Sequence, residues 1–286
     1  MLADVVPLLR CPTCRGQLAI VPGALRCNAG HAFDVARQGY VNLLGAASPG
    51  SADTAAMVLA RAEFLAAGHY RPLADAVAAA AGAGEGPVIE VGAGTAYYLG
   101  VALDRRPASV GLALDVSVAA SRRAARAHRR VGAVVADAWA RLPVADGCAD
   151  TAIVAFAPRG GAEIARVLRP GGHLVVLTPL PGHLGELVEP LGLLAVDDRK
   201  DERLRTALAP WFAVMATQTL QFGLRLDAGD AVRVAAMGPS AFHTAAGELR
   251  RRVAGLVLPV EVTAAVTVTT LQPHHPHTHL RRDHVP

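Results

Sequence analysis

The sequence predicts an α/β fold organised around a doubly wound, mostly parallel sheet. From Pro87 onward, short apolar runs alternate with segments of helical spacing, which is the order of parallel strands connected by helices. Near the C-terminus, residues 214–226 and 260–271 alternate like extended strands instead. We therefore expect a parallel sheet that is closed at one edge by two long antiparallel strands.

Each element has a local signal in the sequence. Strands of the parallel part are predicted at residues 88–91, 109–114, 133–136, 151–156 and 173–178. The helices beside them are predicted to begin near Ala96, Ser117, Gly161 and His183. Before the sheet, residues 54–67 have helical spacing with Asp53 as a candidate N-cap, and a second helix follows Gly68 and runs to about residue 81. Further helices, at 230–237 and 245–256, are expected between the two long strands.

The composition is that of a globular protein with a substantial core. The chain has 286 residues, of which 52% are hydrophobic, enough for one large domain with a small appendage. It shows neither an apolar run of the roughly 18–20 residues that a membrane span needs nor a secretory signal, so a cytoplasmic location is expected. The formal net charge is +4, and Lys200 is the single lysine among 28 basic residues. Arginine suits phosphate binding, but a GC-rich genome also explains this bias, so the charge only permits a nucleic-acid partner.

Three of the four cysteines fall within the first 27 residues, and a histidine follows them closely. The candidate metal ligands are Cys11, Cys14, Cys27 and His31. A C-x-x-C turn places two thiolates on one side of a metal, and a second pair from the next turn completes a tetrahedral Cys₃His zinc site. Four protein ligands leave no open position, so this Zn²⁺ is expected to be structural. A disulfide, or cysteines scattered as core residues, is the alternative, and Cys148 lies far away in the sequence.

A glycine turn follows the first parallel strand. That strand is apolar except for Glu90, and Gly92, Gly94 and Thr95 come directly after it. Glycines let a nucleotide-like ligand lie against the backbone, and the start of the next helix offers free N–H groups. A dinucleotide site needs a third glycine, where this chain has Ala96 or the tyrosine after it, and a carboxylate beside a pyrophosphate is repulsive. The turn therefore favours S-adenosylmethionine over a nicotinamide cofactor.

Acidic residues mark the ends of three successive strands. Asp115 ends the second strand at a spacing that suits the ribose hydroxyls of a nucleoside, and Asp137 follows the third, where an acid can accept from an adenine amino group. Each could instead be a helix cap. Together with Glu90 they favour S-adenosylmethionine, because ligands bind at the carboxyl ends of such strands. The turn at 168–172, before the fifth strand, is common in enzymes that use this cofactor.

These features resemble the RlmA type of 23S rRNA guanine-N1 methyltransferases along nearly the whole chain, from Cys11 to about Leu271. The segments that carry the resemblance are the cysteine–histidine group, Ala36–Leu44, Ala60–Tyr70, Phe156–Arg159, and Thr178–Pro179 with His183–Leu184. The chain is most similar to the Gram-positive branch, which includes a tylosin-resistance methyltransferase. The resemblance implies a class I (Rossmann-like) S-adenosylmethionine-dependent methyltransferase fold with a small N-terminal zinc-binding domain. It also implies methylation of a guanine in a hairpin loop of rRNA domain II, and a role in macrolide resistance.

The resemblance assigns roles to particular residues. Tyr70, Gly94, Thr95 and His183 are implied as cofactor contacts, although Tyr70 could be a core aromatic and His183 a helix-start residue. The zinc module is expected to grip RNA, with arginines as candidate phosphate contacts: Arg10, Arg15, Arg26 and Arg37. Arg159 could hold the base or a phosphate, or be a solvated loop charge. The group that handles the N1 proton of guanine cannot be named, so the catalytic residue is unknown.

The expected organisation has three parts: a zinc-binding RNA-recognition module at 1–45, a methyltransferase domain at 46–272 and a disordered His-rich tail at 273–286. The expected partner is a hairpin of 23S rRNA, and a homodimer would let two zinc modules form an RNA-holding cleft. A methyltransferase of small natural products is one alternative function. A zinc-ribbon nucleic-acid-binding regulator with a ligand-sensing domain is another, and a NAD(P)-linked oxidoreductase is the least favoured.

Overall fold

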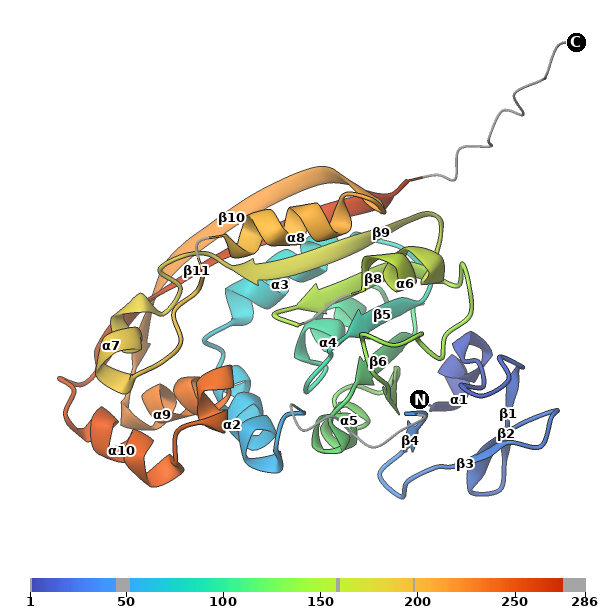
Figure 1. Ribbon diagram of the computed structural model, residues 1–286, viewed down its shortest axis with the longest axis horizontal. Helices are drawn as coiled ribbons and strands as arrows, with labels where there is room; N and C mark the ends of the chain where they lie inside the picture. The colour runs from blue at the N-terminus through green and yellow to red at the C-terminus, as the bar shows by residue number, and fades with distance from the viewer. Residues whose placement is uncertain (1, 45–51, 158–159, 198, 275–286) are drawn as a thin grey trace, which may run out of the picture.

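An eight-stranded mixed sheet forms the centre of the molecule. The computed structural model describes residues 2–44, 52–157, 160–197 and 199–274, and its main sheet has the order β10-β11-β9-β8-β5-β6-β7-β4 (Figure 1). The parallel strands are β4 (Tyr40–Asn42), β5 (Val88–Val91), β6 (Gly111–Asp115), β7 (Val131–Val135), β8 (Ala149–Ala155) and β9 (Leu168–Pro179). The antiparallel strands are β10 (Phe212–Leu226) and β11 (Val260–Pro273). The predicted fold class is confirmed.

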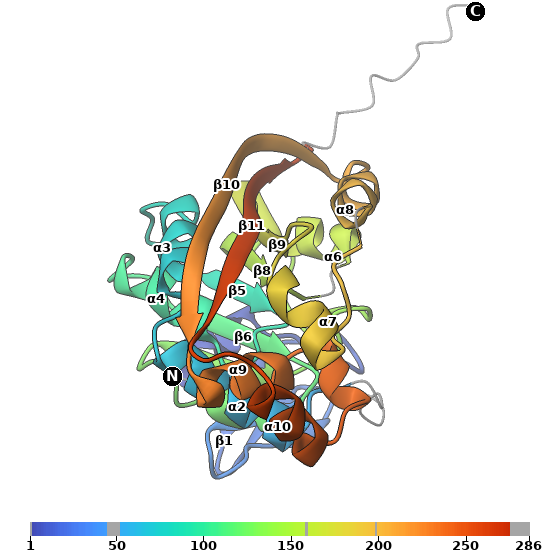
Figure 2. The ribbon, with the colours of Figure 1, turned by 90° about the vertical axis from the view of Figure 1, so that its left-hand side faces the viewer.

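Helices cover both faces of this sheet, and each face has its own apolar core. One core contains residues of the strands together with residues of α2 (Ala55–Ala66), α3 (Arg71–Ala80), α4 (Tyr97–Asp104), α9 (Ala228–Ala236) and α10 (Ala246–Ala254). The other packs α1 (Leu2–Val5), the short helix η1 (Val6–Leu8), α6 (Gly161–Val167) and α8 (Lys200–Leu208). Figure 2 shows α3 and α4 on the opposite side of the strands from α6 and α8. Neighbouring side chains of a central strand alternate between the cores: Val88 belongs to the first and Ile89 to the second.

The N-terminal segment contributes to the main domain as well as to its own small sheet. That small sheet consists of β1 (Leu18–Val21), β2 (Ala24–Cys27) and β3 (Ala32–Asp34). Yet β4, within the segment expected to be the zinc module, pairs in parallel with β7 as the edge strand of the main sheet. α1 and η1 pack into one of the two main cores. Segments before and after residue 45 thus belong to the same sheet and the same core. The domain boundary at residue 45 therefore stays a prediction.

Capping explains where the helices around the glycine turn begin. Thr54, and not Asp53 as expected, caps α2, because the Thr54 hydroxyl accepts the Met57 N–H at 3.3 Å while Asp53 pairs with Arg61. Ser117 caps α5 (Val118–Ala124) by accepting the Ala120 N–H at 3.2 Å. These caps fix the helix starts at the edge of the sheet where the strands end.

Several elements differ from the sequence-based expectation. The helix expected near residue 183 is a short helix η2 (Gly185–Leu187) followed by α7 (Val188–Leu191). β9 begins at residue 168 rather than 173. α8 was not predicted, because most of its residues are polar or charged and only Leu204 and Leu208 mark its buried face. Another short helix, η3 (Pro239–Phe242), follows α9. Within the described ranges, none of the helices combines the length and apolar character that a membrane crossing requires. The His-rich tail predicted at 273–286 lies largely outside the described residues.

Candidate active site and metal centre

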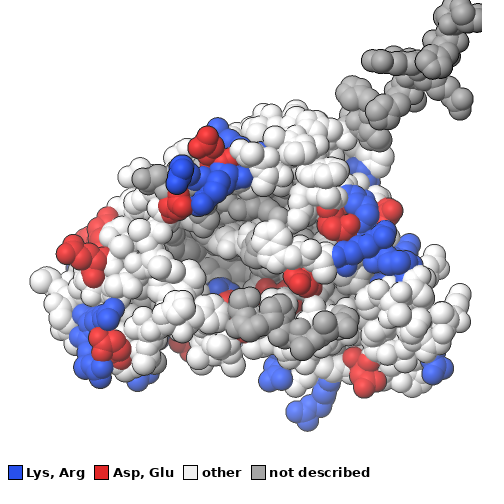
Figure 3. Space-filling view, in the orientation of Figure 1, with Lys and Arg blue, Asp and Glu red and all other residues white. Residues whose placement is uncertain are grey.

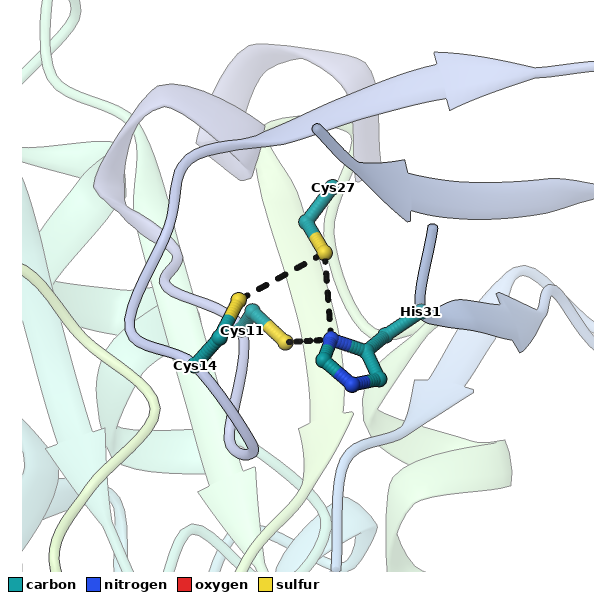
Figure 4. A group of neighbouring side chains, drawn as sticks. All are labelled: Cys11, Cys14, Cys27 and His31. Atoms are coloured by element: carbon teal, nitrogen blue, oxygen red, sulfur yellow. Dashed lines mark hydrogen bonds between the residues drawn. The ribbon is translucent and has the colours of Figure 1, made fainter. Parts of the chain in front are cut away.

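Four side chains of the N-terminal segment converge on one point. Cys11 and Cys14 lie in the turn before β1, Cys27 ends β2, and His31 precedes β3 (Figure 4). Their ligand atoms all lie within 4.8 Å of one another. The Sγ atoms of Cys14 and Cys27 are 3.6 Å apart, and His31 Nδ1 lies 3.6 Å from Cys11 Sγ and 3.4 Å from Cys27 Sγ. A tetrahedral zinc site implies edges of roughly 3.5–3.8 Å, so this ligand set fits Zn²⁺.

Two hydrogen-bonded turns hold these ligands in place. The Cys11 N–H donates to the Gly16 carbonyl at 2.8 Å, and the Arg15 N–H donates to the Cys11 carbonyl at 2.9 Å. In the second turn, Gly30 adopts φ +88°, where glycine is unstrained, and the Cys27 N–H donates to the His31 carbonyl at 3.0 Å. None of the four cysteines forms a disulfide bond, so the disulfide alternative is wrong. Cys148 lies outside the cluster and donates to the Ala145 carbonyl.

A cavity of about 360 Å³ lies at the carboxyl ends of β5, β6, β7 and β8. This volume is within the range of roughly 300–1,000 Å³ that small-molecule sites occupy. Its wall includes most of the residues predicted to contact the cofactor: Tyr70, Glu90, Gly92, Gly94, Thr95, Asp115 and Asp137. The structure thus brings together side chains that are up to 67 positions apart in sequence (137 − 70). Their roles as cofactor contacts remain a proposal.

Two buried carboxyl groups accept backbone N–H groups of the glycine turn and of the helix that follows it. Asp115 accepts the Gly94 N–H at 2.7 Å with one oxygen and the Ser117 N–H at 2.8 Å with the other. Burial raises the pKa of Asp115 above its ordinary value, while these two hydrogen bonds act in the opposite direction. Glu90 is 1% exposed and accepts the Leu99 N–H at 3.2 Å. Burial raises the pKa of Glu90 well above its ordinary value, which favours the neutral form of the carboxyl group. A neutral Glu90 would repel a pyrophosphate less than the sequence suggested.

The backbone of the glycine turn is shaped for close approach. Gly92 has φ +70°, and a Cβ there would lie 2.3 Å from the Cβ of Ala157, so only glycine fits. Gly94 has φ +54°. Ala96, at the position of the missing third glycine, also has a left-handed backbone, with φ +57°, and its methyl group is fully buried. An alanine methyl is therefore accommodated there, as expected.

Tyr70 and His183 form a hydrogen-bonded pair beside the cavity. The Tyr70 hydroxyl lies 3.0 Å from His183 Nε2, and the Ala265 N–H donates to His183 Nδ1 at 3.1 Å. Tyr70 lines the cavity, whereas His183 is not one of the residues of the cavity wall and contacts the Tyr70 hydroxyl. Burial raises the pKa of Tyr70 far above its ordinary value, so the phenol stays protonated.

Several residues of the cavity wall were not predicted as site residues. Arg61 pairs with Asp53 and donates to the Met237 carbonyl at 2.7 Å, which ties α2 to the end of α9. Trp139, Phe156 and Phe242 are exposed aromatics on the same wall. Aromatic residues make up 4% of the chain, so a tryptophan two positions after Asp137 was a signal in the sequence that could have identified Trp139 as a site residue. Asp137 itself accepts the Trp139 N–H at 2.9 Å.

The arginines predicted to contact RNA have different surroundings. Arg26 and Arg37 are exposed on the N-terminal segment. Arg10 donates to the Leu9 and Pro7 carbonyls, and Arg15 donates to the Leu142 and Val144 carbonyls at 3.0 Å. Arg15 thereby joins the metal-binding turn to the main domain. Arg159 lies outside the described residues.

Comparisons with known proteins agree with both sites. The zinc-ribbon family described as "RlmA, N-terminal" matches residues 9–51, and a "Methyltransferase domain" family matches residues 89–176. A solved complex of a provisionally named methyltransferase with the Haloferax volcanii Trm112 activator has a TM-score of 0.52 at 20% identity, covering 78% of this chain and 99% of that one. This similarity supports the fold, which is that of class I S-adenosylmethionine-dependent methyltransferases with an N-terminal zinc ribbon.

Relatives in sequence are considerably more similar. The 23S rRNA (guanine(748)-N(1))-methyltransferase of Streptomyces fradiae is 49% identical, covering 96% of this chain and 99% of that protein. A protein of Micromonospora griseorubida, provisionally named a 23S rRNA (guanine-N(1)-)-methyltransferase, is also 49% identical, over 94% of this chain and 99% of its own length. A provisionally named relative from Bacillus subtilis is 28% identical over 76% of this chain. The chain therefore belongs to the family of 23S rRNA (guanine-N1)-methyltransferases.

Proposed function

We propose that this protein transfers a methyl group from S-adenosylmethionine to N1 of a guanine in a hairpin loop of 23S rRNA. The observation that carries the proposal is the cavity at the glycine turn, walled by Glu90, Asp115 and Asp137 at the ends of three parallel strands. The reaction and the RNA are those named for the relatives that are 49% identical over nearly their whole length.

The residues of the cavity suit the parts of this cofactor. Gly92 and Gly94 line the cavity, and Asp115 retains lone pairs for ribose hydroxyls beside its bonds to Gly94 and Ser117. Asp137 is placed one strand further, where we propose that it faces the adenine. Tyr70, backed by His183, offers a hydroxyl group at the opposite side of the glycine turn.

The main contribution of the protein to this reaction is to align the methyl group of the cofactor with the attacking nitrogen of the base. The bound cofactor supplies a methyl carbon on a positively charged sulfur. The glycine turn, Asp115 and Asp137 would hold this cofactor so that guanine N1 could take the methyl group, with the sulfur keeping the electron pair of the carbon–sulfur bond and the N1 proton being released. The cavity walls would hold the two reactants in line, and this alignment is the main source of acceleration in such a transfer. A donor near guanine O6 would stabilise the developing anion.

The surroundings of the cavity suit an RNA substrate. Figure 3 shows a hollow face with Arg side chains over α8 and over α6, next to the N-terminal module, and acidic groups among them. The zinc ribbon, β1 to β3, lies at one end of the molecule in this view, at the lower right of Figure 1. We propose that it grips the RNA, with exposed Arg26 and Arg37 as better phosphate contacts than Arg10 and Arg15, whose guanidinium groups bind backbone carbonyls.

Primer extension on rRNA tests the proposal. A methyl group on guanine N1 blocks Watson–Crick pairing and halts reverse transcriptase. We expect a new stop on 23S rRNA that has been incubated with the protein and S-adenosylmethionine, and none without cofactor. Transfer of labelled methyl to small acceptors but not to rRNA would contradict the proposal and favour a natural-product methyltransferase. Absence of cofactor binding in calorimetry would favour the nucleic-acid-binding regulator.

The proposal includes three expectations that come from the family resemblance. A cytoplasmic location follows from a ribosomal substrate. A homodimer is tested by the mass in solution with and without RNA. A role in macrolide resistance predicts that deletion of the gene increases susceptibility, and unchanged susceptibility would remove that role while leaving the reaction intact.

A further inference from the structure

Phe156 has a backbone conformation that is unusual for its residue type. It follows β8 with φ +54°, in the left-handed region that a bulky residue rarely adopts without a compensating constraint. The next residue, Ala157, packs so closely on Gly92 that no side chain fits between them. The strained turn is therefore clamped against the glycine turn of the cofactor site, and the side chain of Phe156 enters the cavity wall.

The ring of Phe156 is supported by other aromatic rings yet remains partly open. Its centroid lies 6.2 Å from that of Tyr70, 5.8 Å from that of His183 and 6.3 Å from that of Tyr98. Tyr70 and Tyr98 are 2% and 7% exposed, whereas Phe156 is 38% exposed. Phe156 is thus held by buried aromatic rings while part of its own ring is exposed in the cavity. The exposed part of the ring is available to stack on a planar ligand.

The position of Phe156 separates it from the groups proposed to hold the nucleoside. In the sheet order β7-β6-β5-β8, Asp115 and Asp137 end β6 and follow β7, on one side of β5. Phe156 follows β8, on the other side. The cavity therefore has a carboxylate side and an aromatic side, divided by the glycine turn after β5. Trp139, which is 72% exposed and follows Asp137, belongs to the carboxylate side.

We infer that Phe156 is the platform on which the target base stacks once it leaves its RNA partners. The inference rests on the proposed function and adds to it the residue that holds the base. Guanine N1 lies on the Watson–Crick edge, so the base must be splayed out of the RNA before it can react. A splayed base loses its stacking partners in the RNA, and an aromatic side chain of the protein can replace them. Stacking on a ring leaves that edge free to face the methyl group.

The test compares Phe156→Leu, which keeps an apolar side chain but has no aromatic face, with Phe156→Tyr, which keeps the face. The substrate is 23S rRNA that wild-type protein methylates, and cofactor affinity is measured separately by calorimetry. We expect Phe156→Leu to lower kcat/KM for rRNA by roughly tenfold or more, since base–aromatic stacking contributes at this level. Its affinity for S-adenosylmethionine should stay within about twofold of wild type, and Phe156→Tyr should restore most of kcat/KM.

Two tryptophan variants provide the contrast. Trp139→Leu lies on the carboxylate side and should weaken cofactor binding. Trp211→Leu, at a tryptophan that is 45% exposed away from the cavity wall, should change neither quantity. The inference is overturned if Phe156→Leu methylates rRNA as wild type does, or if it loses cofactor affinity as steeply as kcat/KM. If the wild-type protein methylates no guanine in 23S rRNA, it is the proposed function that fails.

Discussion

The hydroxyl of Tyr70 lies 3.0 Å from Nε2 of His183, a residue 113 positions further along the chain. Because the Ala265 N–H donates to Nδ1, the neutral ring carries its proton on Nε2 and donates it to the Tyr70 oxygen. The phenolic proton of Tyr70 is then directed to another acceptor. Since Tyr70 lines the cavity, a bound cofactor or base can supply that acceptor.

Tyr70→Phe should therefore weaken the binding of S-adenosylmethionine by about tenfold, the size expected for one lost hydrogen bond. Calorimetry measures this directly. Because burial raises the pKa of Tyr70, the difference between wild type and variant should be the same at pH 6.5 and pH 8.5. Tyr40→Phe, in β4 and outside the cavity wall, is the matched control and should bind as wild type. Equal affinity of Tyr70→Phe and wild type would show that the hydroxyl does not contact the cofactor.

Glu90 should make stability depend on pH. Burial raises its pKa well above the ordinary value of 4.5, so between that value and the raised pKa the folded state holds a proton that the unfolded state releases. The free energy of unfolding contributed by Glu90 is therefore fully present below about pH 4.5 and is lost as pH rises through the folded pKa.

Glu90→Gln removes this dependence. Urea unfolding from pH 5 to pH 8 should show the variant gaining stability relative to wild type by about 1.4 kcal/mol per pH unit within the window. Asp115 is present in both proteins, and its negative charge is one of the causes that raise the pKa of Glu90. Parallel curves for the two proteins would mean that Glu90 is ionised in the folded state.

Gly92→Ala and Gly100→Ala form a matched pair of glycine substitutions. At Gly92 a methyl group would lie 2.3 Å from the Ala157 Cβ and would require φ +70°, so we expect destabilisation by about 3 kcal/mol and loss of cofactor binding. At Gly100, within α4, the nearest neighbour of an added Cβ is 4.0 Å away, and alanine should stabilise the helix by about 0.5–1 kcal/mol. Denaturant unfolding measures both. A tolerated Gly92→Ala would show that the turn can move away from Ala157.

Zinc should be required by the N-terminal segment. Cys14→Ser removes one of four ligands, and we expect it to release the metal and to lower the unfolding temperature, because α1 and η1 beside the site pack into a main core. Cys148→Ser is the matched control, since Cys148 lies outside the cluster, and it should retain about one zinc per chain. Metal content by atomic spectroscopy and thermal unfolding provide the measurements. Full metal retention by Cys14→Ser would remove this residue from the ligand set.

The features that could be predicted from sequence depend on local patterns of residues. The cysteine–histidine spacing, the strand Val88–Val91 and the glycines after it each depend on residues within a few positions of one another. Acids at successive strand ends could be placed together because parallel strands bring their carboxyl ends to one edge. The structure confirms the sheet and gathers Glu90, Asp115 and Asp137 around one cavity.

What the sequence by itself determined is thus the class of fold, the metal ligands and the location of the cofactor turn. Tertiary structure alone decided that β4 joins the main sheet, that His183 contacts Tyr70, and that Phe156 is held in a left-handed conformation in the cavity wall. The physical reason is that these features arise from contacts between distant segments. Ala157 against Gly92 and Ala265 against His183 are each made only after the sheet has brought its strands together, and no periodicity records them.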